Sequence, residues 1–313
     1  MSNTPTLRDA ILYFADFEHC RHFMMELLWA DGKVKCPQCG AEKVTWLAKP
    51  RVWKCYAGHQ KPTFSLKTGM IFEDSPIGLE QWLPTAWMLI NCKNGISSYE
   101  LHRAMGVTQK TAWFMLHRIR LAMQSGTFSK LGGEVEVDET FIGGKSRNMH
   151  FAKRQEKIGG RGTGGKEVVF GIVERDGEVR AMHTMGRSKP ELQRNIRAHV
   201  AAGSAIFSDE LKSYEGLDRD YTHAVIDHAV AYVNGNVHTN TMENFWSLLK
   251  RGLHGTYISV EPFHLFRYLD EQAFRYNNRD LTDAERFAIV MKDIVGRRLT
   301  YGQLTAAGQV AHG

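Results

Sequence analysis

The order of strand and helix patterns between residues 134 and 252 constrains the fold more than any other feature of this sequence. The strand pattern "GEVEVDETFIGG" is followed by "KEVVFGIVERDGEVRAMHTMG", which predicts two strands of a hairpin that turns at Asp176-Gly177. A helix is expected after Pro190, then the short strand "SAIFSD", the strand "YTHAVI" and a helix in "NTMENFWSLLKRG". Strands that give way to helices in this manner predict an α/β domain.

Three carboxylates stand at distinctive places in this pattern. Asp138 lies in the first strand, Asp209 ends the fourth strand, and Glu243 lies in the first turn of the last helix. The element order is that of an RNase H-like fold, in which the first and fourth strands are neighbours in the sheet. We therefore expect Asp138 and Asp209 to lie side by side, with Glu243 brought in above them.

The acids next to these residues are expected to point elsewhere. Strand alternation divides the first strand into one face with Val135, Val137 and Glu139 and another with Glu134, Glu136 and Asp138. Glu139 is therefore excluded from the predicted site, and Glu210 is excluded for the same reason.

A site made of carboxylates suits Mg²⁺ or Mn²⁺, which prefer oxygen ligands. Two such ions about 3.5–4 Å apart ease in-line displacement at phosphorus, because one activates the attacking oxygen and the other stabilises the leaving oxygen. Asp138 would bridge both ions, Asp209 would hold one, and Glu243 the other. Taken alone, Glu243 could simply complement the dipole of its helix. The two strand carboxylates favour catalysis.

A second metal site is predicted from "KCPQCGAEKVTWLAKPRVWKCYAGHQ", in which a CxxC turn is followed by a CxxxH turn. The expected ligands are Cys36, Cys39, Cys55 and His59. Zn²⁺ takes four sulfur or nitrogen ligands in a tetrahedron, so this segment predicts a structural zinc ribbon. The alternative is a set of cysteines without a metal. Cys20 and Cys92 lie in apolar helical patterns and are expected in the core.

The segment "GISSYELHRAMGVTQKTAWFMLHRIRLAM" has the layout of a helix-turn-helix. Ser97 or Ser98 can cap its first helix. Gly106 makes the turn, and Thr108 can cap the second helix. The side chains expected to contact DNA from this second helix are Gln109, Lys110, Arg118 and Arg120. A structural pair of helices is the alternative.

Two further segments carry positive charge that could contact DNA phosphates. Residues 143–167 are basic and glycine-rich without periodicity, which predicts a loop. Its "GRGTGGKE" imitates a phosphate-binding motif, but Glu167 stands where Ser or Thr would bind Mg²⁺, so this is not an ATP site. The expected phosphate contacts are Lys153, Arg154 and Arg161 in the loop and Lys250 and Arg251 on the last helix. The alternative for the loop is a solvated insertion.

The composition is consistent with an anionic partner. The 313 residues carry a formal net charge of +6, which favours nucleic acid, although many ordinary enzymes share such an excess. No signal peptide is predicted, and the most apolar window, "WLPTAWMLINC", is too short to span a bilayer. The five cysteines do not suggest a disulfide framework. We expect a soluble cytoplasmic protein that associates with the bacterial nucleoid when bound to DNA.

The blocks "VDETFIGG", "SDELKSY" and "HTNTMENFWSLLKRGLHGTY" resemble the three catalytic blocks of DDE insertion-sequence transposases. The likeness runs from about residue 15 to 305 and is greatest to the group with an N-terminal zinc ribbon. It implies that Asp138, Asp209 and Glu243 are the catalytic triad. His238 and Asn240, which precede the last helix, could position DNA or cap the helix, and the resemblance favours a site role for His238.

The predicted fold class is α/β, with an RNase H-like (retroviral integrase-type) catalytic domain preceded by a zinc ribbon and a helix-turn-helix module. The expected parts are a helical segment (1–30), the zinc ribbon (31–73), the helix-turn-helix module (74–127), the catalytic domain (128–280) and a helical tail (281–313).

The resemblance implies a DNA transposase that binds the terminal inverted repeats of its insertion sequence. Metal-dependent hydrolysis would free 3′-hydroxyls at the ends, and transesterification would join them to target DNA. The expected partners are double-stranded DNA and further copies of the chain, as a homodimer or higher oligomer, and no membrane. Two alternatives stay open: another RNase H-fold DNA nuclease or resolvase, and a domesticated DNA-binding regulator without catalysis.

Overall fold

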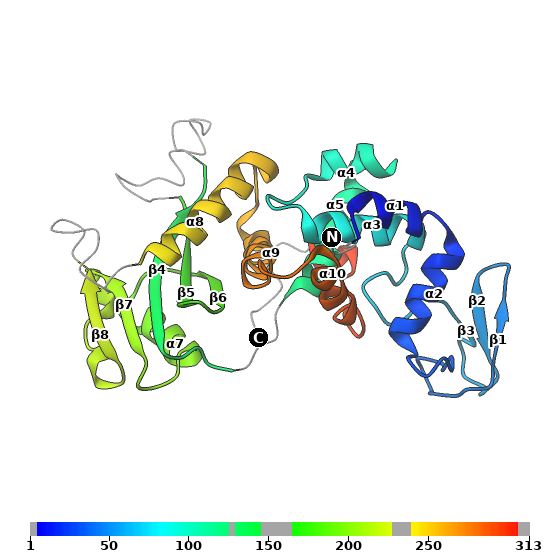
Figure 1. The fold of residues 1–313 in the computed structure, drawn as a ribbon, viewed down its shortest axis with the longest axis horizontal. Helices are drawn as coiled ribbons and strands as arrows, with labels where there is room; N and C mark the ends of the chain where they lie inside the picture. The colour runs from blue at the N-terminus through cyan, green and yellow to red at the C-terminus, as the bar shows by residue number, and fades with distance from the viewer. Residues whose placement is uncertain (1–4, 125–128, 145–164, 227–238, 306–313) are drawn as a thin grey trace. The chain divides into compact units, whose positions relative to one another are not determined.

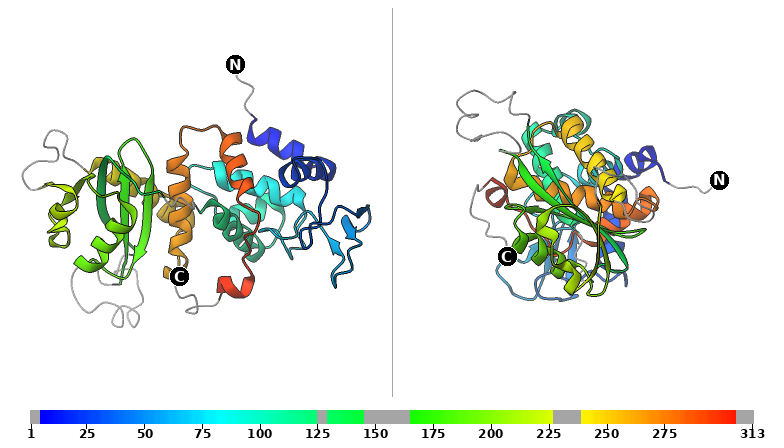
Figure 2. Two further views of the ribbon diagram at one scale, coloured as in Figure 1. Left: turned by 90° about the horizontal axis from the view of Figure 1, so that it is seen from below. Right: turned by 90° about the vertical axis from the view of Figure 1, so that its left-hand side faces the viewer.

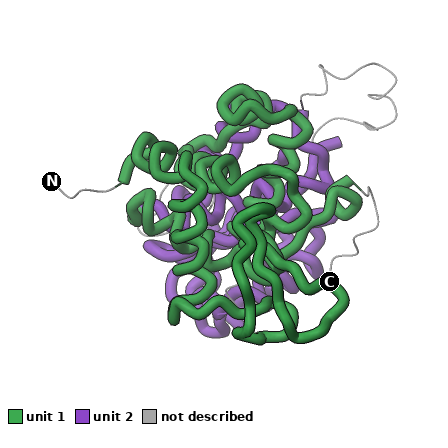
Figure 3. Tube along the Cα trace, turned by 90° about the vertical axis from the view of Figure 1, so that its right-hand side faces the viewer, with its two compact units in different colours: residues 1–124, 280–313 green, residues 125–279 purple. Residues whose placement is uncertain are grey.

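The computed structural model describes residues 5–124, 129–144, 165–226 and 239–305 (Figure 1). The chain forms two compact units (Figure 3). Unit 1 comprises residues 1–124 together with 280–313, and unit 2 comprises residues 125–279. The predictions for Lys153, Arg154, Arg161 and His238 lie outside the described residues.

Unit 1 begins with two helices, α1 (Leu7–Phe14) and α2 (Phe17–Leu28), where the sequence predicts a single helical segment. The break follows from local capping. The side chain of Asp16 accepts a hydrogen bond of 2.6 Å from the backbone N–H of Glu18 and so starts the second helix.

A three-stranded antiparallel sheet follows, made of β1 (Val44–Leu47), β2 (Val52–Cys55) and β3 (Thr63–Phe64) in that order. Its apolar face is aromatic. The ring of Trp53 lies 4.3 Å from Trp46 and 5.8 Å from Phe64, measured between centroids. Aromatic contacts of this kind give a very small sheet much of its buried area.

The rest of unit 1 is helical, with α3 (Leu79–Asn91), α4 (Ser98–Met105), α5 (Gln109–Met123), α10 (Asp283–Lys292) and α11 (Tyr301–Thr305). The predicted caps of α4 and α5 are confirmed: Ser97 forms a capping box, Gly106 ends α4 with a φ of 65°, and Thr108 caps α5. The C-terminal segment packs back on this unit, where the guanidinium of Arg286 donates to the side chain of Asn91 at 3.0 Å.

Unit 2 is built on a mixed five-stranded sheet with the order β6-β5-β4-β7-β8. Its strands are β4 (Glu134–Ile142), β5 (Glu167–Glu174), β6 (Val179–Thr184), β7 (Ala205–Asp209) and β8 (Thr222–Ile226). β4, β5 and β6 pair antiparallel, whereas β7 pairs parallel with both β4 and β8. The expected pairing of the first and fourth strands, and the hairpin turn at Asp176-Gly177, are both confirmed.

Helices cover both faces of this sheet (Figures 1 and 2). On one face α8 (Asn240–Gly252) and α9 (Leu265–Asn277) pack on Val169 and Val173. On the other face α7 (Lys189–His199) and the 3₁₀ turns η2 (Lys212–Tyr214) and η3 (Leu217–Arg219) pack on Val135 and Val137. A π-helical turn, η4 (Leu253–Tyr257), and a 3₁₀ turn, η5 (Pro262–His264), join α8 to α9. Within the described residues we find no helix with the length and apolar character that crossing a membrane requires.

Candidate functional site

The four predicted zinc ligands converge in unit 1. The ligand atoms of Cys36, Cys39, Cys55 and His59 all lie within 4.8 Å of one another. The Sγ atoms of Cys39 and Cys55 are 3.7 Å apart, and Cys36 Sγ lies 3.4 Å from His59 Nε2. With Zn–S bonds of about 2.3 Å and Zn–N bonds of about 2.0–2.1 Å, the edges of a tetrahedron would be about 3.8 Å and about 3.6 Å. The observed separations therefore fit the edges of a zinc tetrahedron.

Local backbone geometry forms both ligand-bearing turns. Gly40 follows the CxxC turn and donates to the carbonyl of Cys36 at 2.8 Å. Gly58 precedes His59 with a φ of 83°, a conformation that favours glycine. Burial raises the pKa of the Cys36 thiol, but hydrogen bonds from neighbouring backbone N–H groups outweigh this effect and lower its pKa to about 7. A lowered thiol pKa favours the thiolate that a metal binds.

The predicted carboxylate site lies at one end of the sheet in unit 2. The parallel register pairs Glu136 with Phe207, so two positions further along each strand Asp138 comes level with Asp209. Val137 on β4 and Ile206 on β7 pack on the face that α7 covers. Strand alternation therefore places Asp138 and Asp209 on the other face, which α8 covers. Asp138 and Asp209 are therefore neighbours across the β4–β7 pair, as the sequence predicts.

A hydrogen bond that the sequence did not predict connects Asp138 to α8. The indole N–H of Trp246 donates to Asp138 Oδ2 at 2.9 Å. This contact needs a glycine opposite Asp138 on β5: a Cβ on Gly171 would lie 2.6 Å from the Trp246 ring and 2.2 Å from Met242 Cε. Trp246 is buried, as its position beside Phe245 suggests, and its polar edge faces the candidate site.

The surroundings of Asp138 disfavour its negative charge when no cation is near. Burial raises its pKa to about 7, and the charges of Glu139 and Asp209 add to this effect, whereas the bond from Trp246 opposes it. Among the described residues, no Lys or Arg forms a salt bridge with Asp138 or Asp209. A buried carboxylate beside a second one, with oxygen as the only ligand element, is a donor set that suits Mg²⁺ or Mn²⁺.

Glu139 points away from α8, as the strand alternation predicts. Its carboxylate accepts a hydrogen bond of 2.5 Å from the hydroxyl of Tyr214, which lies on the opposite face of the sheet. Arg187 Nη1 lies 3.6 Å from the other oxygen. Burial raises the pKa of Glu139, and the charge of Asp209 acts in the same direction. Glu139 is thus a buried, partnered acid on the far side of the strand.

Glu243 lies in the first turn of α8 and is exposed. It precedes Trp246 by three positions, so the two side chains share a face of the helix. Among the described residues, one group of three or more His, Cys, Asp or Glu side chains has its ligand atoms close enough to hold a metal ion, and it is the cysteine-histidine group. The carboxylate of Glu243 therefore does not form such a group with Asp138 and Asp209. Asn240 at the start of α8 and Arg251 near its end are exposed, and Lys250 is half-buried.

The predicted DNA contacts on α5 divide into two groups. Lys110 is exposed, with its Nζ 4.6 Å from the centre of the Tyr301 ring, and Gln109 donates to the hydroxyl of Ser98 at 2.8 Å. Arg118 and Arg120, however, are only 4% and 1% exposed.

The prediction that Arg118 and Arg120 contact DNA from this helix is therefore wrong for the structure described. The guanidinium of Arg118 donates to the backbone carbonyls of Leu299 at 3.0 Å and Glu73 at 2.8 Å. These two hydrogen bonds join the C-terminal segment to the rest of unit 1. The helical pattern could not reveal this, because the partners are distant in the sequence.

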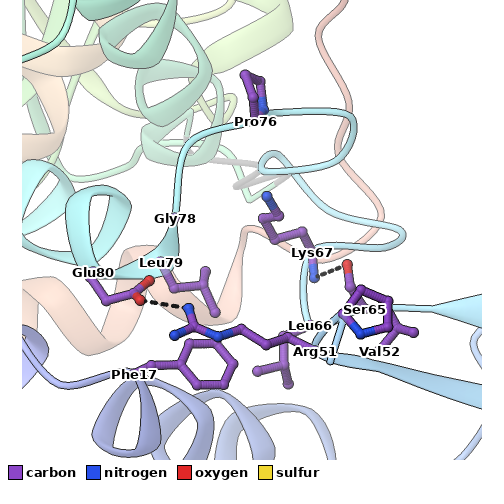
Figure 4. Close-up of a pocket in the computed structure, with 11 residues that line it drawn as sticks. Phe17, Arg51, Val52, Ser65, Leu66, Lys67, Pro76, Gly78, Leu79 and Glu80 are labelled. Atoms are coloured by element: carbon purple, nitrogen blue, oxygen red, sulfur yellow. Dashed lines mark hydrogen bonds and ion pairs between the residues drawn. The ribbon is translucent and has the colours of Figure 1, made fainter. Parts of the chain in front are cut away.

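A pocket of about 370 Å³ in unit 1 opens beside β2 (Figure 4). The charged side chains that line it form ion pairs and hydrogen bonds with other residues of the protein. Arg51 pairs with Glu80 at 2.8 Å and stacks over the Phe17 ring, while Lys67 donates to the carbonyl of Ile77 at 3.0 Å. These contacts hold the small sheet to α2 and α3, so we regard the pocket as a packing feature.

Comparison with known sequences gives two family matches. Residues 130–277 match the family described as "ISXO2-like transposase domain", and residues 16–60 match the "Transposase zinc-ribbon domain". A Halobacterium salinarum protein named "Uncharacterized protein in transposable element ISH50" is 27% identical over 251 residues, which cover 77% of this chain and 84% of that protein.

Comparison with solved structures gives a weak likeness to a chain in the simian T-cell lymphotropic virus intasome in complex with PP2A regulatory subunit B56 gamma. The identity is 13%, the TM-score is 0.26, and the match covers 70% of this chain and 69% of that chain. A TM-score this low does not establish a shared fold.

Proposed function

Because this chain belongs to the DDE insertion-sequence transposases that join a zinc ribbon to an ISXO2-like transposase domain, we propose that it cleaves the DNA ends of its own element and joins them to target DNA. The observation that carries this proposal is the register of β4 and β7, which brings Asp138 level with Asp209. The bond from Trp246 to Asp138 supports it further, since that bond fixes the helix that bears Glu243.

The proposed catalytic domain is RNase H-like. The sheet order, with the hairpin strands on one side of β4 and the parallel strands on the other, agrees with the order that the sequence predicts. We assign it to residues 128–280, preceded by the zinc ribbon (31–73) and a helix-turn-helix module (74–127), with helical segments at 1–30 and 281–313.

In this proposal Asp138, Asp209 and Glu243 would hold two Mg²⁺ or Mn²⁺ ions. The bound ions supply the positive charge that activates the attacking oxygen and stabilises the leaving oxygen. Asp138 and Asp209 would contribute carboxylate oxygens from the sheet, and Glu243 would contribute its carboxylate from the exposed side of α8.

The proposed reaction has two steps, hydrolysis at the element end and strand transfer to target DNA. In the first, the oxygen of water bonds to phosphorus at the element end, the bond from phosphorus to the 3′-oxygen breaks, and a 3′-hydroxyl is released. In the second, that 3′-hydroxyl attacks a phosphodiester of target DNA, a new bond to phosphorus forms, and the 3′-oxygen of the target strand leaves. Neither step needs a covalent intermediate with the protein.

Recognition of the ends is assigned to the zinc ribbon and to α4 and α5, with Gln109 and Lys110 as the DNA contacts that remain available on α5. Lys250 and Arg251 would meet backbone phosphates beside the cleavage site. Since two ends must be paired, the working complex would contain at least two copies of the chain. It would act on double-stranded DNA at the bacterial nucleoid.

Substitution of Asp209 tests the proposal, with the adjacent exposed Glu210 as the matched control. The full-length protein would be mixed with labelled DNA that flanks its gene, in Mg²⁺, and both binding and cleavage would be measured. Asp209→Asn should abolish cleavage, by at least about a hundredfold, and preserve binding, because a metal ligand is removed without altering the DNA-contacting surface. Glu210→Gln should behave as wild type. Equal cleavage by all three proteins would refute the site.

A further inference from the structure

A buried ion pair in unit 2, formed by Glu136 and Arg175, is not used in the proposed chemistry. Glu136 lies on β4 with no exposed side-chain surface, and Arg175 follows β5. Arg175 Nε donates to Glu136 Oε1 at 3.0 Å, and Arg175 Nη1 pairs with Glu134 at 2.8 Å. A fully buried carboxylate such as that of Glu136 must be satisfied by well-directed bonds, so its other contacts show which elements it connects.

The carboxylate of Glu136 is bound to the start of α8. It accepts hydrogen bonds from the backbone N–H of Thr241 at 3.0 Å, the hydroxyl of Thr241 at 3.0 Å and the backbone N–H of Met242 at 3.1 Å. These backbone groups are the ones that a capping side chain satisfies at a helix N-terminus. Thr239, the residue in the capping position, makes no such side-chain bond. A carboxylate from the sheet therefore replaces the usual cap.

The guanidinium of Arg175 extends the same connection to the neighbouring strand. It lies 4.1 Å from the centre of the Phe207 ring on β7. Together the two residues thus contact β4, β7 and α8, the three elements that bear the proposed triad. Glu136 precedes Asp138 by two positions and Phe207 precedes Asp209 by two positions.

From this juxtaposition we propose that Glu136 and Arg175 are a positioning pair, which fixes the height and rotation of α8 over the sheet so that Glu243 faces Asp138 and Asp209. Glu136 touches neither metal nor DNA in this assignment and acts through the helix. The inference rests on the proposed transposase function for its catalytic consequence, but its structural part can be measured without any activity.

The test compares full-length wild type with Glu136→Gln and with Glu134→Gln as the matched control, since Glu134 pairs with the same arginine from an exposed position on the same strand. Glutamine at position 136 would direct an N–H₂ group at the helix N–H groups or at Arg175. Hydrogen exchange at the amides of Thr241 and Met242 is the first readout. It should accelerate at least about tenfold in Glu136→Gln and change less than about twofold in Glu134→Gln.

The second readout is single-turnover cleavage of DNA that flanks the gene, as a function of Mg²⁺ concentration. Misplacement of Glu243 should raise the Mg²⁺ concentration for half-maximal cleavage at least about tenfold in Glu136→Gln, with much of the rate recovered at high Mg²⁺. A loss of folding alone would lower the rate at every Mg²⁺ concentration. Thr241→Val, which removes only the hydroxyl bond, should produce a smaller shift in the same direction, and it serves as the test if Glu136→Gln does not fold.

The outcomes separate the two proposals. If the exchange and the Mg²⁺ dependence of Glu136→Gln match those of Glu134→Gln, the positioning role is refuted. If the amides of Thr241 and Met242 exchange faster but the wild-type protein does not cleave, the cap stands and the transposase function fails. If exchange accelerates while the Mg²⁺ dependence of cleavage is unchanged, Glu136 is only a helix cap and the positioning role is again refuted.

Discussion

Replacing Asp138 with asparagine should stabilise unit 2 in the absence of Mg²⁺, although it should abolish cleavage. The carboxyl of Asp138 has its pKa raised by burial from an ordinary value of 3.8 to about 7. Between these values the folded state binds a proton that the unfolded state releases. The contribution of Asp138 to the free energy of unfolding is therefore greatest below pH 4 and falls as the pH rises towards 7.

The size of this effect follows from the same two values. Each unit of pKa difference corresponds to about 1.4 kcal/mol, so a difference of about 3 predicts a loss of about 4 kcal/mol once the carboxyl is ionised in both states. Asparagine carries no charge at any of these pH values. It also keeps an oxygen that can accept the hydrogen bond from Trp246. The variant should therefore show none of this loss.

The assay is hydrogen exchange at the amides of β5 and β6, which gives the free energy of opening of these strands. It is carried out between pH 4 and 8 in buffer without divalent ions other than the bound zinc. Asp176→Asn, at the exposed hairpin turn, is the control and should keep the wild-type pH dependence. Added Mg²⁺ should recover stability in the wild type alone, because the ion compensates the charge of Asp138. Parallel pH profiles for wild type and Asp138→Asn would refute the assignment of an uncompensated buried carboxylate.

Two further predictions concern the packing that supports the sites. Cys55→Ser should release the zinc that the wild-type protein retains, as measured by metal content per chain, because a tetrahedral site loses one of its four ligands; undiminished zinc would contradict the ligand set. Gly171→Ala should destabilise unit 2 by about 1–3 kcal/mol in urea unfolding, since its Cβ would lie 2.6 Å from the Trp246 ring. Gly132→Ala, where a Cβ meets nothing within 4 Å, is its control, and equal stabilities would contradict the close approach of α8.

The features that the sequence predicted correctly are those that local patterns decide. Apolar alternation identifies the strands of unit 2, and Asp176-Gly177 identifies the hairpin turn between β5 and β6. The caps at Ser97 and Thr108 follow from short-range hydrogen bonds of the chain with itself. Even the pairing of β4 with β7 follows once the order of the elements is known, because few sheet topologies accommodate it.

The features that the sequence did not predict depend on contacts between distant residues. Arg118 is charged and was expected at the surface, but it is buried because the carbonyls of Glu73 and Leu299 satisfy its guanidinium. The alternation pattern placed Glu136 on the same face as Asp138 without indicating that it caps a helix more than a hundred residues away. A residue type states which bonds a side chain can make, but only the fold decides which partners reach it.

The central claim, that this chain is a transposase whose chemistry depends on three carboxylates, is tested most directly by mapping strand breaks in DNA. A supercoiled plasmid that carries the gene with its native flanking DNA would be incubated in Mg²⁺ with wild-type protein or with Glu243→Gln, and every nick would be located. The account predicts nicks at two inverted boundaries with the wild type and none with the variant. Boundary nicks from both proteins would contradict the role of Glu243, and no boundary nicks from either would contradict the proposed function.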